Sequence, residues 1–317
     1  MAVYRIGDMI RMKREALGFT REQFCEMSEE ICGEQTLYRI ESGKVKVKQE
    51  IYRKLMECMG ELQERSYAAI MVSDYRALNL KTEIQFYLVQ REYEEAEKKL
   101  KELEQFMDGE YARNKQYLLE IKSQIAYYKQ QISFEKYLDN LWEALRYTIP
   151  NLDRIEFESW PYNCEEFEIF IDILNIFHAN NEKEKEEKLL LQLKRNVEKK
   201  YMNEDYYVSR HLNCLVGLSQ LMCMEQKHEI SIEYCREGVE EVKKQRILGM
   251  VYNLLYDLSW NKEELIQKKI LDKEERESCK RILVQAYYLS IAQGMEHSTE
   301  RIKRLCERNY PGEITLI

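Results

Sequence analysis

The stretch SEEICGEQTLYRIESGK, residues 28–44, decides the fold of the first sixty residues. Leu37 and Ile40 are three residues apart, so both fall on one side of a helix that is predicted to begin near Gly33 and to end at Gly43. The other side of this helix then carries polar side chains, namely Glu34, Gln35, Tyr38, Arg39 and Ser42. An amide pairs with adenine and a guanidinium with guanine, so these side chains suit base edges. Spacing alone, however, favours the plainer interpretation, the polar surface of a small helical bundle.

Three further helices are predicted around this one. The first covers about residues 3–17 and ends at Gly18, because glycine adopts the left-handed conformation at low cost. The second begins at Thr20 and Gln23, a capping-box pair, and fades after Ser28. The fourth covers about residues 48–59. Four short helices separated by turns indicate a helix-turn-helix unit, with the second helix starting beside Arg21, which would point at a backbone phosphate.

Residues 28–44 resemble the Cro/repressor (XRE) class of helix-turn-helix regulators. The turn Ile31-Cys32, followed by the run from Arg39 to Gly43, is similar to the peptide-pheromone-responsive branch from Gram-positive bacteria, the PlcR and Rgg type. The resemblance implies a transcriptional regulator that binds an operator in double-stranded DNA and a short signalling peptide. The candidate DNA-binding residues are Arg21, Glu34, Gln35, Thr36, Tyr38, Arg39, Lys44 and Lys46.

Residues 61–317 are predicted to be helical apart from an irregular segment with Trp160-Pro161, because Pro and Gly number only 3 and 11 in the chain while helix formers are abundant. The helices are expected in pairs: about 64–91 with 93–107, 112–131 with 133–148, 164–179 with 182–200, 205–225 with 228–245, a fifth unit from Ile247, and 273–294 with 296–309. Such pairs indicate an all-α, tetratricopeptide-like solenoid, with an irregular helical bundle as the alternative. We therefore expect a DNA-binding domain over residues 1–60 and a sensor and dimerisation domain over residues 61–317.

A seven-residue motif, N-x-L-x-x-L-S, occurs at residues 213–219 and again at 253–259. Together with Asn175, it places an asparagine on three successive first helices. Neighbouring helices lie ~10 Å apart and an extended peptide rises ~3.3 Å per residue, so Asn175, Asn213 and Asn253 could hold a peptide backbone at about every third residue. The motif alone fits packing amides equally well. The resemblance favours the clamp, because regulators of that type hold their peptides with asparagines on inner helices. Tyr256, one turn after Asn253, is expected to line the groove.

Charge and composition restrict the remaining possibilities. The net charge of −8 divides into +1 for residues 1–60 and −9 for the rest, so the acidity does not belong to the DNA-binding unit. Nine cysteines without metal-ligand spacing indicate buried thiols in a cytosolic protein. No export signal and no apolar run of ~20 residues is apparent, so we expect a cytoplasmic protein without a membrane partner.

An enzyme is the weakest interpretation, because the sequence has no phosphate loop, no zinc motif and no nucleophile elbow. We expect neither catalytic residues nor a metal or cofactor. The stronger rival is a regulator whose repeats bind a folded protein, as an antitoxin-type or phage-type scaffold. A homodimer is expected in either case, because one nearly neutral helix-turn-helix unit reads too few base pairs alone.

Overall fold

The computed structural model describes residues 6–28, 31–45, 51, 54–55, 58–59, 76–107, 112–149, 151–198, 204–245 and 248–314. These residues form helices and connecting turns with no strand among them, which confirms the all-α prediction. The chain divides into two compact units, Met1–Asn181 and Glu182–Ile317. The predicted domain boundary between residues 60 and 61 lies outside the described residues and stays a prediction.

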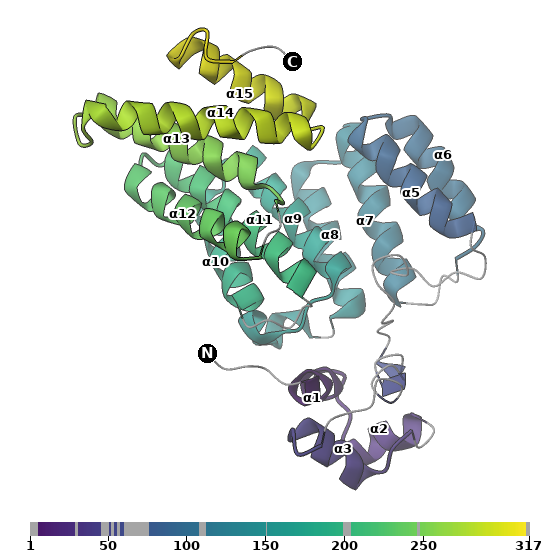
Figure 1. Ribbon diagram of the computed structural model, residues 1–317. Coiled ribbons are helices and arrows are strands. Elements are labelled where there is room, and N and C mark those ends of the chain that lie inside the picture. The colour runs from purple at the N-terminus through teal and green to yellow at the C-terminus, as the bar shows by residue number, and fades with distance from the viewer. Residues whose placement is uncertain are drawn as a thin grey trace. The chain divides into compact units, whose positions relative to one another are not determined.

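The first three helices are α1 (Ile6–Ala16), α2 (Arg21–Met27) and α3 (Glu34–Glu41) (Figure 1). Gly18 follows α1 with a φ of +79°, as predicted for its end. The predicted capping box at the start of α2 is also confirmed, since Thr20 Oγ1 accepts from the Gln23 backbone and Gln23 Oε1 from the Thr20 backbone. The predicted fourth helix, 48–59, is described only in part, and there Leu55 is fully buried.

An apolar core joins these helices. Leu37 and Ile40 of α3 are buried, as their spacing predicted, and belong to one cluster with Ile10 and Phe24. Gly7 allows α1 to approach α3 closely, because a Cβ atom added there would lie 1.9 Å from the backbone oxygen of Ile40. The polar face of α3 is therefore held by contacts on its opposite side.

The helices that follow lie near the predicted ranges, and those of the first, second and fourth predicted pairs pack against each other. The third predicted pair, 164–179 with 182–200, falls across the two units and stays a prediction. In the unit Met1–Asn181 these are α5 (Arg76–Val89) with α6 (Tyr93–Glu104), α7 (Ala112–Tyr128) with α8 (Phe134–Thr148), and α9 (Cys164–Ala179). Two short 3-10 helices, η1 (Leu152–Arg154) and η2 (Phe157–Ser159), form the irregular segment before α9. The unit Glu182–Ile317 holds α10 (Lys183–Glu198), α11 (Glu204–Met224), α12 (His228–Gln245), α13 (Val251–Gln267), η3 (Lys273–Glu275), α14 (Arg276–Ala292) and α15 (Glu296–Asn309).

The same turn closes five of these helices. In each case the second residue after the helix has a positive φ; the helices are α5, α7, α11, α13 and α14. The backbone N–H of the residue that follows donates to the carbonyl five residues earlier in the chain. The left-handed residues are Arg91, Gln130, Gln226, Lys269 and Gly294. This hydrogen bond and conformation define a Schellman motif, which lets the chain reverse directly into the next helix. The recurring turn accounts for the antiparallel pairs.

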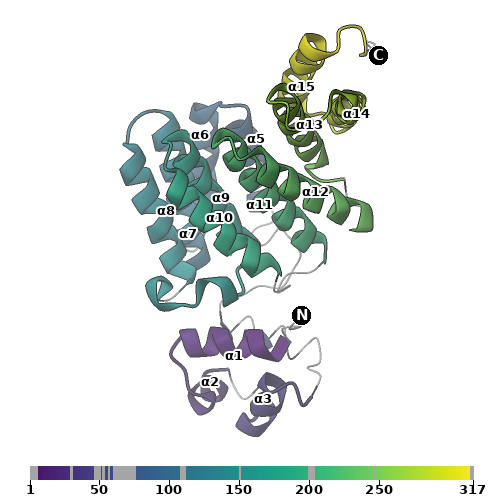
Figure 2. The ribbon, with the colours of Figure 1, turned by 90° about the vertical axis from the view of Figure 1, so that its left-hand side faces the viewer.

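One predicted pairing needs correction. Residues 273–294 and 296–309 were expected to form a separate final pair, but α14 packs along α13 as well as against α15 (Figures 1 and 2). The fifth unit therefore consists of α13 and α14, and α15 is an additional terminal helix on it. Within the described residues, none of the helices combines the length and the hydropathy needed to cross a bilayer.

Candidate functional site

The outer face of α3 is polar and accessible. Glu34, Gln35, Thr36, Tyr38 and Arg39 are all exposed, whereas the buried side of the helix holds Leu37, Ile40 and Glu41. The residues that the sequence predicted as base readers thus share one exposed helix face. Lys46, the last of the predicted DNA-binding residues, lies outside the described residues.

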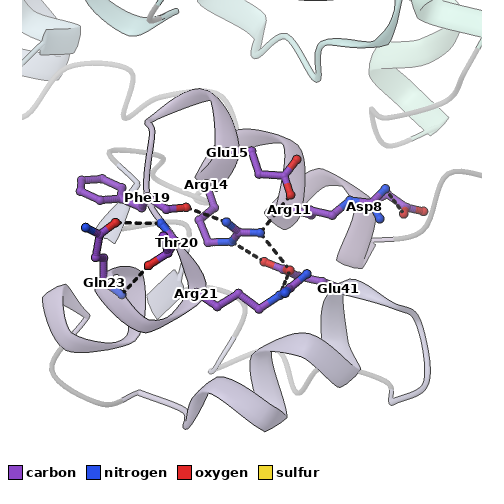
Figure 3. Close-up of polar contacts among 9 residues, drawn as sticks. All are labelled: Asp8, Arg11, Arg14, Glu15, Phe19, Thr20, Arg21, Gln23 and Glu41. Atoms are coloured by element: carbon purple, nitrogen blue, oxygen red, sulfur yellow. Dashed lines mark hydrogen bonds and ion pairs between the residues drawn. The ribbon is translucent and has the colours of Figure 1, made fainter.

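A buried ion cluster fixes α3 to the two helices before it (Figure 3). Arg14 of α1 donates to the Glu41 carboxylate through Nε at 2.7 Å and through Nη2 at 3.1 Å, and it donates through Nη1 to the backbone oxygen of Phe19. Arg21 donates to the same carboxylate at 2.6 Å. Arg14 and Glu41 are both almost fully buried. Burial alone lowers the pKa of Arg14, but the hydrogen bond and charge of Glu41 outweigh it and raise the pKa.

Two cations flank Tyr38 on the exposed face. The guanidinium of Arg21 lies 5.2 Å from the ring centre and the ammonium of Lys44 lies 4.9 Å from it. Arg21 was predicted at the start of the second helix, and it is the first residue of α2. The structure therefore brings Arg21, Tyr38 and Lys44 together beside α3. The Arg14–Glu41 contact was missed, because two residues 27 positions apart leave no local pattern.

The three predicted clamp asparagines differ in their surroundings. Asn175, on α9, is exposed and belongs to the unit Met1–Asn181. Asn213, on α11, is partly buried. Asn253, on α13, is buried, and its Oδ1 accepts a hydrogen bond from Arg301 at 2.9 Å. Their joint role as a peptide clamp stays a prediction, and the Asn253 amide already serves one intramolecular contact.

The leucine and serine positions of the repeated motif have packing roles. All four leucines, Leu215, Leu218, Leu255 and Leu258, are buried. Ser219 donates to Asp257 at 2.8 Å and Ser259 donates to the backbone oxygen of Cys279 at 3.0 Å. Burial raises the pKa of Asp257 to about 7, although the Ser219 hydrogen bond lowers it. The repetition of the leucines and serines therefore reflects helix packing, which leaves only its asparagines as ligand candidates.

A charged cluster joins α10, α11 and α12. Ligand-type atoms of Glu198, His211 and Glu237 lie within 4.8 Å of one another, a spacing that a metal ion would accept. The Lys194 ammonium, however, lies 2.5 Å from the Glu198 carboxylate and 2.9 Å from that of Glu237. Hydrogen bonds from His211 and then Lys194 lower the pKa of Glu237 to about 2 against the effect of burial. A cation of the chain itself already contacts both carboxylates, so we interpret the cluster as ion pairs, one of which joins two helices.

The chain folds as helix-turn-helix elements followed by paired helices. Solved structures share this class of fold. The chain is similar to PlcR of Bacillus thuringiensis in complex with the peptide PapR7 and DNA, with 20% identity, a TM-score of 0.56, and coverage of 94% of this chain and 98% of that one. It is similarly related to the apo form of PlcR, with 17% identity, a TM-score of 0.55 and the same coverage.

These likenesses confirm that the fold extends over nearly the whole chain, as the resemblance in sequence led us to expect. No family model matches the sequence, and no curated protein matches it.

Proposed function

We propose that the chain is a DNA-binding transcriptional regulator, and not an enzyme, whose helical repeats bind a short signalling peptide. The exposed polar face of α3, held from behind by the buried contacts of Arg14 and Arg21 with Glu41, carries the proposal for DNA. Gln35 and Arg39 read base edges in this proposal, while Lys44 contacts phosphates. Such a protein acts in the cytoplasm, where its operator is accessible.

The fold shared with PlcR, whose solved complex contains both a peptide and DNA, supports the peptide part of the proposal. The alternative, a repressor whose repeats bind a folded protein, would use the same fold without a peptide. Mass spectrometry of the protein purified from its own cells separates the two, because a peptide ligand would co-purify and dissociate on denaturation. Recovery of a stoichiometric protein partner instead would contradict the peptide proposal.

The DNA-binding part is tested by selecting operators from random duplexes with the full-length protein. Arg39→Ala should then weaken binding to the selected operator by ~1–3 kcal/mol, since one bidentate base contact is lost. We further propose a homodimer that reads two half-sites ~34 Å apart, because one unit reads too few base pairs. A palindromic selected site and a dimer mass in light scattering are expected. Unchanged operator affinity of Arg39→Ala would show that α3 is not the reading helix.

A further inference from the structure

Three arginines of α15 face two aromatic residues of α13. Arg301, Arg304 and Arg308 follow the spacing i, i+3, i+7 and therefore share one helix face. Tyr256 and Trp260 are four residues apart on α13. The Arg301 guanidinium lies 4.5 Å from the Tyr256 ring centre, and that of Arg308 lies 5.2 Å from the Trp260 ring. The two helices enclose an open cavity of about 430 Å³, lined by Tyr256, Trp260, His297, Glu300, Arg301, Arg304, Leu305 and Arg308.

The cavity has an excess of positive charge. Glu300 is the sole acid among its lining residues, and it pairs with Arg304 at 3.2 Å. The hydrogen-bond acceptors that the described residues offer to Arg301 and Arg308 are the neutral amide oxygens of Asn253 and Asn309. Among the described residues, neither guanidinium is ion-paired with a carboxylate, although the charge of the buried Asp257 acts on Arg301 when that acid is ionised. An anion entering here would meet two guanidinium groups that have no carboxylate in direct contact.

The guanidinium groups are also oriented in advance. Stacking on the Tyr256 ring and the hydrogen bond to Asn253 fix Arg301, so less side-chain entropy is lost when it binds a ligand. A planar guanidinium matches a carboxylate through two parallel hydrogen bonds. The rings and Leu305 supply apolar surface for the residue that carries the carboxylate.

From this geometry we infer that the cavity between α13 and α15 binds a carboxylate group of a peptide ligand. The inference rests on the proposed function and deepens it, because it assigns a carboxylate of the peptide to a defined site beside Asn253. The carboxylate comes either from the C-terminus of the peptide or from an acidic side chain. Both sources use the same recognition chemistry and are separated by the test.

The experiment compares three N-acetylated random heptapeptide libraries on the full-length protein, with retained peptides identified by mass spectrometry after gel filtration. The first library has free C-terminal carboxylates and no Asp or Glu, the second is the same library as C-terminal amides, and the third is amidated but contains Asp and Glu. We expect the first or the third to be retained at least about tenfold better than the second, the effect of one charged hydrogen-bonded contact. Preference for the first assigns a terminal carboxylate and preference for the third assigns a side chain.

The double variant Arg301→Gln/Arg308→Gln should lose this preference, whereas Arg281→Gln, at an exposed arginine of α14, should keep it. Equal retention of all three libraries by the wild-type protein would overturn the carboxylate site while leaving peptide binding intact. Preference that survives in the double variant would overturn the assignment to this cavity. No retention of any library would overturn the proposed peptide function itself, and the carboxylate site with it.

Discussion

Arg14 and Glu41 are 27 residues apart in sequence and are joined by two hydrogen bonds inside the first three helices (Figure 3). Their contact links α1 to the C-terminal end of α3, while Arg21 links α2 to the same carboxylate. The outer face of α3 can serve as a reading surface only while this inner attachment holds. The DNA-binding proposal thus depends also on Arg14 and Glu41, two buried residues that would touch no DNA.

Arg14→Ala should destabilise these helices by about 3 kcal/mol, because it leaves the buried Glu41 charge with Arg21 as its remaining partner. Hydrogen exchange of the α1–α3 amides in the full chain measures this directly. The matched control is Arg11→Ala, whose partner Asp8 is partly exposed, and it should cost less than about 1 kcal/mol. Equal protection in both variants would show that the buried cluster is not what anchors α3.

Gly7→Ala should weaken operator binding at least about tenfold, through displacement of α3. The added Cβ would meet the backbone oxygen of Ile40 at 1.9 Å, and no side-chain rotation relieves a contact with backbone. Gly33→Ala is the matched control, because nothing lies within 4 Å of a Cβ there and its φ is −68°. The measurement is fluorescence anisotropy with the selected operator. A Gly7→Ala protein that binds as tightly as Gly33→Ala would refute the close approach of the two helices.

Local sequence signals were sufficient for the elements and insufficient for the contacts between them. The capping box at Thr20 and the spacing of Leu37 and Ile40 predicted α2 and α3, because caps and helical periodicity act within one turn. Only the Schellman turn at Gly294 was predicted as a break; the other four escaped prediction, since their left-handed residues are Arg91, Gln130, Gln226 and Lys269 where glycine is usual. Those side chains are tolerated because the turn's hydrogen bonds and the packed helices hold the backbone.

The candidate peptide site was predicted less completely. The repeated motif located Asn253 and Tyr256 correctly on one helix, but their common neighbour Arg301 is 48 residues away from Asn253 and was not expected. Its sequence signal is the i, i+3, i+7 spacing of arginines on α15, which is typical also of a solvated helix face. Only the side-chain contacts of Arg301 and Arg308 with α13 distinguish this helix face from an ordinary solvated one.

Lys44→Ala should weaken binding to all DNA sequences alike and should reduce the slope of log affinity against log salt concentration by about 1, since one phosphate contact is lost. Its ammonium lies 4.9 Å from the Tyr38 ring, at the margin of the α3 face rather than on it. Anisotropy titrations at several salt concentrations, with selected and random duplexes, provide the slopes. Lys243→Ala, at an exposed position of α12, should leave the slope unchanged. A loss confined to the selected operator would instead place Lys44 at a base.

Asp257 should make the unit Glu182–Ile317 less stable as pH rises. Its pKa is about 7 in the folded chain, chiefly through burial, against about 3.9 when unfolded. The folded state therefore binds the proton more tightly, and the contribution present below pH ~4 is lost as pH rises through about 7. Asp257→Asn should flatten this decline in urea unfolding between pH 5 and pH 8, while Asp272→Asn, at an exposed site, serves as the control. A decline of equal steepness in both variants would exclude Asp257 as its source.

Asn213→Ala and Asn253→Ala should separate peptide binding from packing. Asn213 is partly buried on α11 and has no role in the hydrogen bonds described above, so its removal should leave the thermal midpoint unchanged. If its amide meets a peptide backbone, removal costs about 1–3 kcal/mol of affinity, because a peptide polar group is left unmatched. Asn253→Ala removes the acceptor of Arg301 and should lower both affinity and the thermal midpoint.

Calorimetry with a peptide recovered from the library selection, paired with thermal unfolding of each variant, measures both quantities. Asn196→Ala is a buried-amide control on α10, for which we expect a lowered midpoint with unchanged affinity. A bound peptide alters DNA binding only when it binds one conformation of the regulator more tightly than another. The same variants should therefore be titrated with operator at a saturating peptide concentration. Undiminished affinity of Asn213→Ala would mean that the repeated asparagines pack helices, as the leucines and serines of their motif do, and the clamp would then be abandoned.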